Sequence, residues 1–202
     1  MSKKQNQGVS RRQFLRGSAL SAAGTTILNS GLLGHTAETP TGVAVGADPV
    51  PITMRVNGKD HQLSVEPRTT LADALRDTLH LTGTKVVCDR GACSACTVWL
   101  DGTPVNSCLT FALDVGGREV TTIEGLGTPD RMHPVQAAFV EFDAAQCGYC
   151  TPGMVMSTAA LLKANPNPSL EDVQHAIRGN LCRCGTYPKV FEAALAAARK
   201  GA

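Results

Sequence analysis

Aromatic residues are scarce in this sequence: its 202 residues include five Phe, two Tyr and one Trp. With 43% apolar residues a chain of this length can bury one ordinary core or two small ones. Because aromatic side chains supply much of the area that a core buries, we expect neither core to be large. Runs of Lys or Arg are also missing beyond residue 16, and residues 48–202 carry 14 basic against 16 acidic residues. Residues 48–202 therefore have a slightly negative net charge and no basic surface is expected on them, so we expect no binding to nucleic acid.

The chain also lacks a long, strongly hydrophobic run. Residues 17–34, GSALSAAGTTILNSGLLG, are uncharged but diluted by Gly, Ser, Thr and Asn, whereas a membrane-spanning helix is usually richer in large apolar residues. We therefore expect no stable membrane span, and a signal peptide is the better interpretation.

The residues on either side of this stretch support its interpretation as part of a signal peptide. It follows SRRQFLRG, which contains Arg11 and Arg12, and it precedes small residues suited to cleavage at 45–47. This order resembles the twin-arginine export signal, whose route carries proteins that have already folded. The alternative is a disordered tail with a chance arginine pair. We expect residues 1–47 to be a twin-arginine signal peptide and linker, and the protein to be periplasmic.

Cysteine is absent from the first 87 residues, and eight cysteines follow in two groups of four. The first group is Cys88, Cys93, Cys96 and Cys108, and the second is Cys147, Cys150, Cys182 and Cys184. Clusters of this kind predict metal binding, although an even cysteine count in an exported protein is also compatible with disulfides.

Residues 48–127 show the pattern of a small sheet packed on one helix. Apolar and polar residues alternate on both sides of Asn57-Gly58, which predicts a hairpin, and a second hairpin is expected around Asp101-Gly102. Thr70 and Asp73 predict the start of a helix that Gly83 would end. A last strand is expected over residues 119–123, and Trp99 is expected to pack on the sheet.

Beyond the segment GLGTP at residues 125–129 the hydrophobic period becomes helical. Helices are expected over residues 134–142, 152–163, 170–177 and 188–199, with Pro152 and Pro188 in first turns and a start signal at Ser169 and Asp172. The sequence thus predicts a domain over residues 48–127 and a compact four-helix domain over residues 128–202.

The first cysteine group has the spacing C-x4-C-x2-C, and its fourth cysteine, Cys108, follows after 11 residues. This is the plant-type ferredoxin spacing, in which four thiolates hold a 2Fe-2S cluster. Three thiolates from one tight loop converge only if the backbone folds over the cluster, which the small residues Gly91 and Ala92 permit. The fourth ligand can then come from a neighbouring strand. Zinc sites usually present two C-x2-C pairs instead, so zinc and disulfides are the weaker alternatives here.

The second cysteine group combines C-x2-C with C-x-C, and both pairs are expected at helix ends. Pro152 would start a helix whose free N–H groups lie close to the sulfurs, and such groups stabilise thiolate charge. Taken alone this group is also compatible with zinc, but beside the first group an iron-sulfur cluster is the better interpretation. The five histidines are spread out without ligand spacing.

Three runs, CDRGACSACTV, QCGYCTPG and GNLCRCGTY, together resemble the iron-sulfur subunit of the xanthine dehydrogenase family of molybdenum hydroxylases. The resemblance covers the chain from about Ile52 to about Arg199 and implies an α+β protein: a β-grasp, ferredoxin-like 2Fe-2S domain followed by an all-α four-helix 2Fe-2S-binding domain. All eight cysteines are then iron ligands. Ser94 differs, because the family's loop usually has Gly between its second and third cysteines.

The resemblance also implies the cofactors and partners of the complex. A large subunit would bind the molybdenum pterin cofactor, and a medium subunit would bind FAD. Gln146, which immediately precedes the second cysteine group, would contact the pterin; from its sequence alone it is a polar loop residue. Combined with the export signal, the pattern is most similar to the iron-sulfur subunit of periplasmic aldehyde oxidoreductases.

The expected function is electron transfer from the molybdenum cofactor through two 2Fe-2S clusters to flavin or another acceptor, during oxidation of aldehydes to carboxylic acids. The chain has no nucleophile-base constellation and no phosphate-binding Gly-rich loop, so we expect no catalytic residue in it. An N-heterocycle, a purine or carbon monoxide is the alternative substrate. The remaining alternatives are a free-standing ferredoxin and a secreted, disulfide-stapled binding module.

Overall fold

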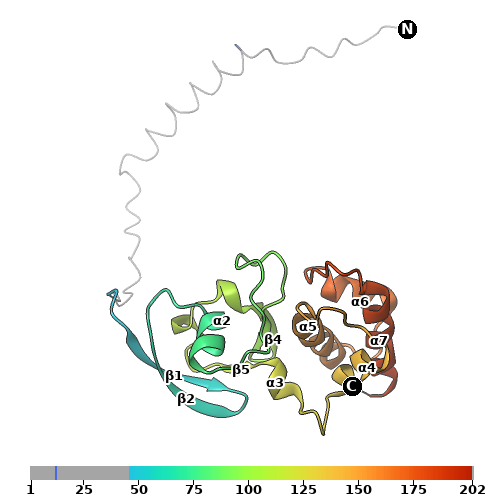
Figure 1. Ribbon diagram of the computed structural model, residues 1–202, viewed down its shortest axis with the longest axis horizontal. Helices are drawn as coiled ribbons and strands as arrows, with labels where there is room; N and C mark the ends of the chain where they lie inside the picture. Colours follow the sequence, from blue (N-terminus) through green and yellow to red (C-terminus); the bar gives the residue numbers. More distant parts are fainter. Residues whose placement is uncertain (1–11, 13–45, 202) are drawn as a thin grey trace, which may run out of the picture. The chain divides into compact units, whose positions relative to one another are not determined.

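The structure is a computed structural model that describes residue 12 and residues 46–201 (Figure 1). The predicted export signal therefore lies outside the described residues, apart from Arg12 and its last two positions. Residues 45–202 group into one unit. In this unit a sheet of five strands is followed by helices.

The sheet has the strand order β2-β1-β5-β3-β4, with the bounds β1 Val50–Val56, β2 Lys59–Val65, β3 Thr97–Leu100, β4 Thr103–Asn106 and β5 Glu119–Thr121. β5 pairs parallel with β1 and antiparallel with β3, so it joins the two predicted hairpins into one mixed sheet. β5 ends at Thr121, not at residue 123 as predicted, because Ile123 begins the short helix α3, Ile123–Leu126.

Both predicted hairpin turns are confirmed. Asn57 and Gly58 have φ values of 50° and 77°, and Asp101 and Gly102 have values of 50° and 79°. Two successive residues with positive φ make the turn that matches the twist of the flanking strands, and Asn-Gly and Asp-Gly adopt it most readily.

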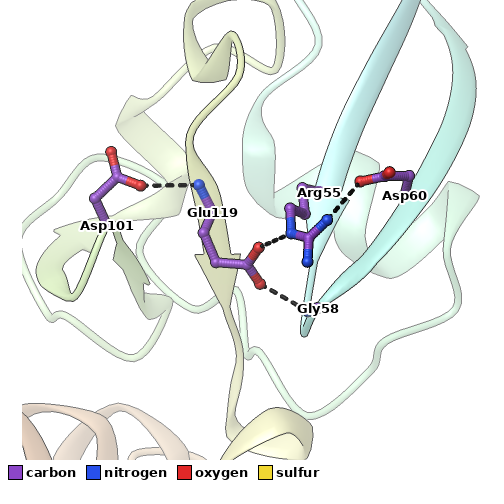
Figure 2. Close-up of polar contacts among 5 residues, drawn as sticks. All are labelled: Arg55, Gly58, Asp60, Asp101 and Glu119. Carbon is purple, nitrogen blue, oxygen red and sulfur yellow. Dashed lines mark hydrogen bonds and ion pairs between the residues drawn. The ribbon is translucent and has the colours of Figure 1, made fainter.

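A carboxylate network joins the two turns to β5 (Figure 2). Glu119 accepts hydrogen bonds from the Gly58 N–H, at 2.7 Å, and from the Arg55 guanidinium, at 2.8 Å. The Glu119 N–H in turn donates to Asp101 at 2.9 Å, and Arg55 also contacts Asp60 at 3.4 Å. One short strand is therefore tied by side chains to both of its neighbours.

The predicted helix of this domain is shorter and partly of another type. α2, Leu71–Asp73, starts at Thr70, whose side chain accepts from the Asp73 N–H, and it continues as the π-helix η1, Ala74–Thr78. His80, with φ of 56°, ends the helix through a hydrogen bond from the Leu81 N–H to the Leu75 carbonyl. This left-handed residue terminates the helix before Gly83 is reached.

The apolar face of α2 and η1 packs on the sheet (Figure 1), and Leu71, Ala74 and Leu75 are buried with Met54 and Val120 in one core. Two single 3-10 turns, η2 Ser107–Leu109 and η3 Leu113–Val115, connect β4 to β5.

The four predicted helices of the second half are confirmed within one or two residues. They are α4 Pro134–Glu141, α5 Thr151–Ala164, α6 Leu170–Ile177 and α7 Tyr187–Arg199. Pro152 and Pro188 lie in first turns, and Ser169 with Asp172 forms a capping box at the start of α6. No described helix is long and apolar enough to cross a membrane.

Trp99 corrects one expectation about packing. Its side chain is buried in the core of the helical half, together with Met154 and Met156, and its indole N–H donates to the Met156 carbonyl at 3.0 Å. The prediction that Trp99 packs on the sheet is therefore wrong, because α5 lies against β3 and the Trp99 side chain is buried between residues of the helical half.

Candidate metal centres

The first four cysteines converge on one loop and one turn. Cys93 and Cys96 are buried in the loop before β3, Cys88 is half-buried at the start of that loop, and Cys108 is buried in η2 just after β4. The fourth ligand candidate, Cys108, thus lies in the turn that follows a strand of the sheet.

The loop folds over its sulfurs through residues with positive φ, namely Asp89 at 52°, Gly91 at 69° and Ser94 at 51°. The left-handed φ of Gly91 favours glycine, and a Cβ atom there would also meet the Leu109 side chain. The Gly91 N–H donates to the Cys108 sulfur at 3.4 Å, and the Ala92 N–H donates to the Cys88 sulfur at 3.3 Å. Inward N–H groups of this kind stabilise thiolates.

The thiols of this group lie in two pairs. Cys88 contacts Cys93, and the Arg90 N–H together with the Cys93 thiol lowers the pKa of Cys88 to about 7. Cys108 contacts Cys96, and burial, followed by the Cys96 thiol, raises the pKa of Cys108 to about 12.

The second four cysteines lie where α5 and α7 begin. Cys150 is the N-cap residue of α5, with Cys147 three residues earlier, and Cys182 and Cys184 lie in the loop before α7. These thiols also form two pairs. Cys150 contacts Cys182, and burial raises the pKa of Cys150 to about 12.

The other pair of the second group is Cys147 with Cys184. The Tyr149 N–H, followed by the Cys184 thiol, lowers the pKa of Cys147. Both residues of this pair are exposed, whereas Cys150 and Cys182 are half-buried. One side of the second centre therefore faces outward.

This pairing fits two-iron clusters. All eight cysteines are free. A 2Fe-2S cluster takes two cysteines on each iron. Each group of thiols offers this arrangement, and the N–H groups at the sulfurs suit the negative charge of the cluster.

The two cysteine loops contact each other directly. The Leu181 N–H donates to the Cys93 carbonyl at 3.0 Å, and the Asn180 side chain donates to the Ser94 carbonyl at 3.0 Å. At Gly153, the third residue of α5, a Cβ atom would lie 2.2 Å from the same Ser94 carbonyl. The absence of a side chain at Gly153 therefore allows the two loops to approach.

The comparisons with known proteins agree with this geometry. Residues 54–119 match the 2Fe-2S iron-sulfur cluster binding domain, and residues 122–195 match the 2Fe-2S binding domain. The chain is 42% identical to the aldehyde oxidoreductase iron-sulfur-binding subunit PaoA of Escherichia coli K12, over 92% of this chain and 86% of that protein.

Two further relatives cover the part of the chain that contains the cysteines. The nicotine 6-hydroxylase small subunit of Paenarthrobacter nicotinovorans is 46% identical over 74% of this chain and 90% of its own length. A crystal structure of quinoline 2-oxidoreductase from Pseudomonas putida 86 superposes with a TM-score of 0.72 at 42% identity, covering 76% of this chain and 98% of that one.

The chain belongs to the iron-sulfur subunits of the xanthine dehydrogenase family of molybdenum hydroxylases. As such it is the electron-transfer part of an oxidoreductase, with a β-grasp 2Fe-2S domain followed by a helical 2Fe-2S domain. The eight cysteines are the residues of this iron-sulfur subunit that would hold the two clusters.

Gln146 of this iron-sulfur subunit is exposed and lines a pocket of about 370 Å³ with Cys184 and Lys189. The predicted cofactor contact and one predicted iron ligand are thus brought to one concave surface. The pterin contact itself stays a prediction.

Sequence reasoning missed the residues that hold the second loop of the subunit. The Tyr187 hydroxyl accepts from the Cys182 N–H at 2.8 Å and donates to the Asn180 carbonyl at 3.1 Å, and the Thr186 hydroxyl lies 3.2 Å from the Cys182 sulfur. A Thr directly before Tyr-Pro has the pattern of an ordinary helix start. No local pattern therefore indicated that Thr186 and Tyr187 contact the Cys182 loop.

Proposed function

We propose that this chain is the electron-transfer subunit of a periplasmic molybdenum hydroxylase that oxidises aldehydes to carboxylic acids. In the overall reaction an aldehyde and water give a carboxylic acid, two protons and two electrons. The partner's molybdenum pterin cofactor supplies the oxidation chemistry. The eight cysteines of this chain would hold two 2Fe-2S clusters, which would carry the electrons one at a time through the second centre and then the first to FAD on a medium subunit.

The observation that carries the choice of aldehyde and periplasm is the extent of the match to PaoA. Residues 48–202 are about three quarters of the chain, so a match over 92% of the chain extends into the region of the predicted export signal. The match to the nicotine 6-hydroxylase small subunit covers 74% of the chain, a share that the two cluster domains account for by themselves.

The surface of the second centre supports its place next to molybdenum. Cys147, Cys184 and Gln146 are exposed together, whereas three of the four thiols of the first centre are buried. A neighbouring apolar pocket of about 510 Å³ shares Asp143 and Ala145 with the pocket of Gln146, and Val140, in its wall, is 68% exposed. Apolar surface beside an electron-entry site suits a subunit contact.

Few covalent bonds and one hydrogen bond connect the two groups of cysteines. Leu181 precedes Cys182 in the chain, and its N–H donates to the carbonyl of Cys93. An electron leaving a cluster at Cys182 would therefore reach Cys93 through the backbone of Leu181 and one hydrogen bond.

The test is to purify the chain with its partner subunits and to add substrates without oxygen. An aldehyde should reduce both clusters, followed as two distinct 2Fe-2S signals in electron paramagnetic resonance, and the acid should form in proportion. Reduction by an N-heterocycle or a purine but by no aldehyde would assign another substrate. A lone, cluster-loaded monomer without partners would overturn the subunit role.

A further inference from the structure

Thr186 is the N-cap residue of α7, but its side chain does not cap that helix. Thr70 and Ser169, at the starts of α2 and α6, both accept a backbone N–H of the first turn, which is the usual role of such residues. Pro188 removes one of the N–H groups that Thr186 would otherwise bind. The Thr186 hydroxyl lies 3.2 Å from the Cys182 sulfur instead.

The direction of this hydrogen bond follows from the chemistry of the sulfur. A cysteine that ligates iron is a thiolate, which has no proton to give, so the hydroxyl of Thr186 must donate.

The first centre differs in this respect. Its sulfurs receive backbone N–H groups, from Gly91 and Ala92, and among the described residues no side-chain hydroxyl bonds to any of its four sulfurs. The donor set of the second centre therefore contains one group that a single substitution can remove.

The loop around Cys182 is held without this hydroxyl. Tyr187 binds the Cys182 N–H and the Asn180 carbonyl, and Asn180, only 3% exposed, donates to the Ser94 carbonyl. Removing the Thr186 hydroxyl should thus change the electrostatics of the sulfur and leave its position in place.

We propose that Thr186 is a positioning residue that raises the reduction potential of the helical-domain cluster. Reduction adds negative charge to the cluster and its sulfurs, so a hydrogen bond donated to Cys182 stabilises the reduced form more than the oxidised form. The cluster thereby becomes a better electron acceptor for the first transfer from the molybdenum cofactor. This inference rests on the proposed function, because it requires a cluster at Cys182.

The experiment is a redox titration of the assembled protein, followed by electron paramagnetic resonance, for wild type, Thr186→Val and Thr186→Ser. Thr186→Val keeps the shape and loses the donor, and it should shift the helical-domain cluster to lower potential. At a fixed ambient potential its ratio of reduced to oxidised cluster should fall about two- to tenfold. Thr186→Ser keeps a hydroxyl and should titrate like wild type, and the ferredoxin-domain cluster should stay unchanged as an internal reference.

An unshifted Thr186→Val with both signals intact would overturn the inference and leave the proposed function standing. Wild type without a helical-domain signal would overturn the proposed function itself. If Thr186→Val loses the cluster, Thr186→Ala, which also lacks the donor, is titrated in its place. A potential below that of wild type and Thr186→Ser supports the hydrogen bond, and an unshifted potential overturns it.

Discussion

Cys93 takes part in both centres through different atoms. Its sulfur pairs with Cys88 in the first group, and its carbonyl accepts the hydrogen bond from Leu181 beside the second group. The side chain and the backbone of this one residue can therefore be tested separately.

Replacing Cys93 by Ser should remove the ferredoxin-domain signal in electron paramagnetic resonance and preserve the helical-domain signal. A serine keeps the backbone contact to Leu181 but is a poor iron ligand. The matched variant Cys184→Ser should give the opposite result. Loss of both signals from a folded protein after either change would contradict two separate centres.

A substitution at Gln146 can distinguish a role in bracing the loop from a contact with the pterin cofactor. If its amide only braces the loop, Gln146→Ala should cost about one hydrogen bond, roughly 1 kcal/mol, in stability. If it binds the pterin, both clusters should keep their spectra, while the complex holds less molybdenum or its clusters are reduced more slowly by substrate. Molybdenum content and the rate of cluster reduction, measured in one preparation, decide; if neither changes, the cofactor contact is refuted.

At the scale of elements, β5 is the short strand that joins the two hairpins, and it pairs with each of its neighbours over two residue pairs. Side chains support this limited pairing. Glu119 receives the Gly58 N–H and the Arg55 guanidinium (Figure 2), and its side chain is one third exposed.

Glu119→Ala should therefore lower the free energy of unfolding by about 1–2 kcal/mol, because the Gly58 N–H and the Arg55 guanidinium lose their partner. Urea unfolding followed by circular dichroism would measure the effect. Glu66→Ala is the matched control: its ion pair with Arg68, which is 87% exposed, should contribute little. Equal effects of the two substitutions would show that the network adds nothing.

At the scale of the whole molecule, the contact between the two cysteine loops brings the cluster domains together at Gly153. A side chain there would meet the Ser94 carbonyl, a backbone atom that cannot simply rotate away. Gly153→Ala should destabilise the protein by about 1–3 kcal/mol and slow electron transfer from the helical-domain cluster to the ferredoxin-domain cluster.

Thermal unfolding and rapid-mixing reduction would measure these two effects. Gly117→Ala is the control, because a Cβ atom at Gly117 meets nothing within 4 Å. A Gly153→Ala protein with wild-type stability and wild-type transfer between clusters would show that the loops do not need this close approach.

Export concerns the whole chain as well. Changing Arg11 and Arg12 to Lys should leave a folded, cluster-loaded protein in the cytoplasm, because the twin-arginine signal is lost while cluster assembly is not. Cell fractionation followed by iron and labile sulfide analysis would measure this. Normal appearance of the double variant in the periplasm would refute the proposed export route.

Elements with local signals could be predicted from the sequence. Asn57-Gly58 and Asp101-Gly102 specify their turns, and Ser169 and Asp172 cap α6, because each of these patterns depends on residues close together in the chain. The spacing of Cys88, Cys93, Cys96 and Cys108 indicated a 2Fe-2S centre, whereas the second group was interpreted in the same way only beside the first.

Contacts between distant residues were decided only by the tertiary structure. The packing of Trp99 on α5, the approach of Gly153 to Ser94 and the hydrogen bond from Leu181 to Cys93 join residues more than 50 positions apart. The role of Thr186 depends on folding too: the sequence places it before a helix, and the fold of the loop turns its hydroxyl toward a sulfur. Hydrogen bonds depend on the direction of each group in space, which a linear pattern does not specify.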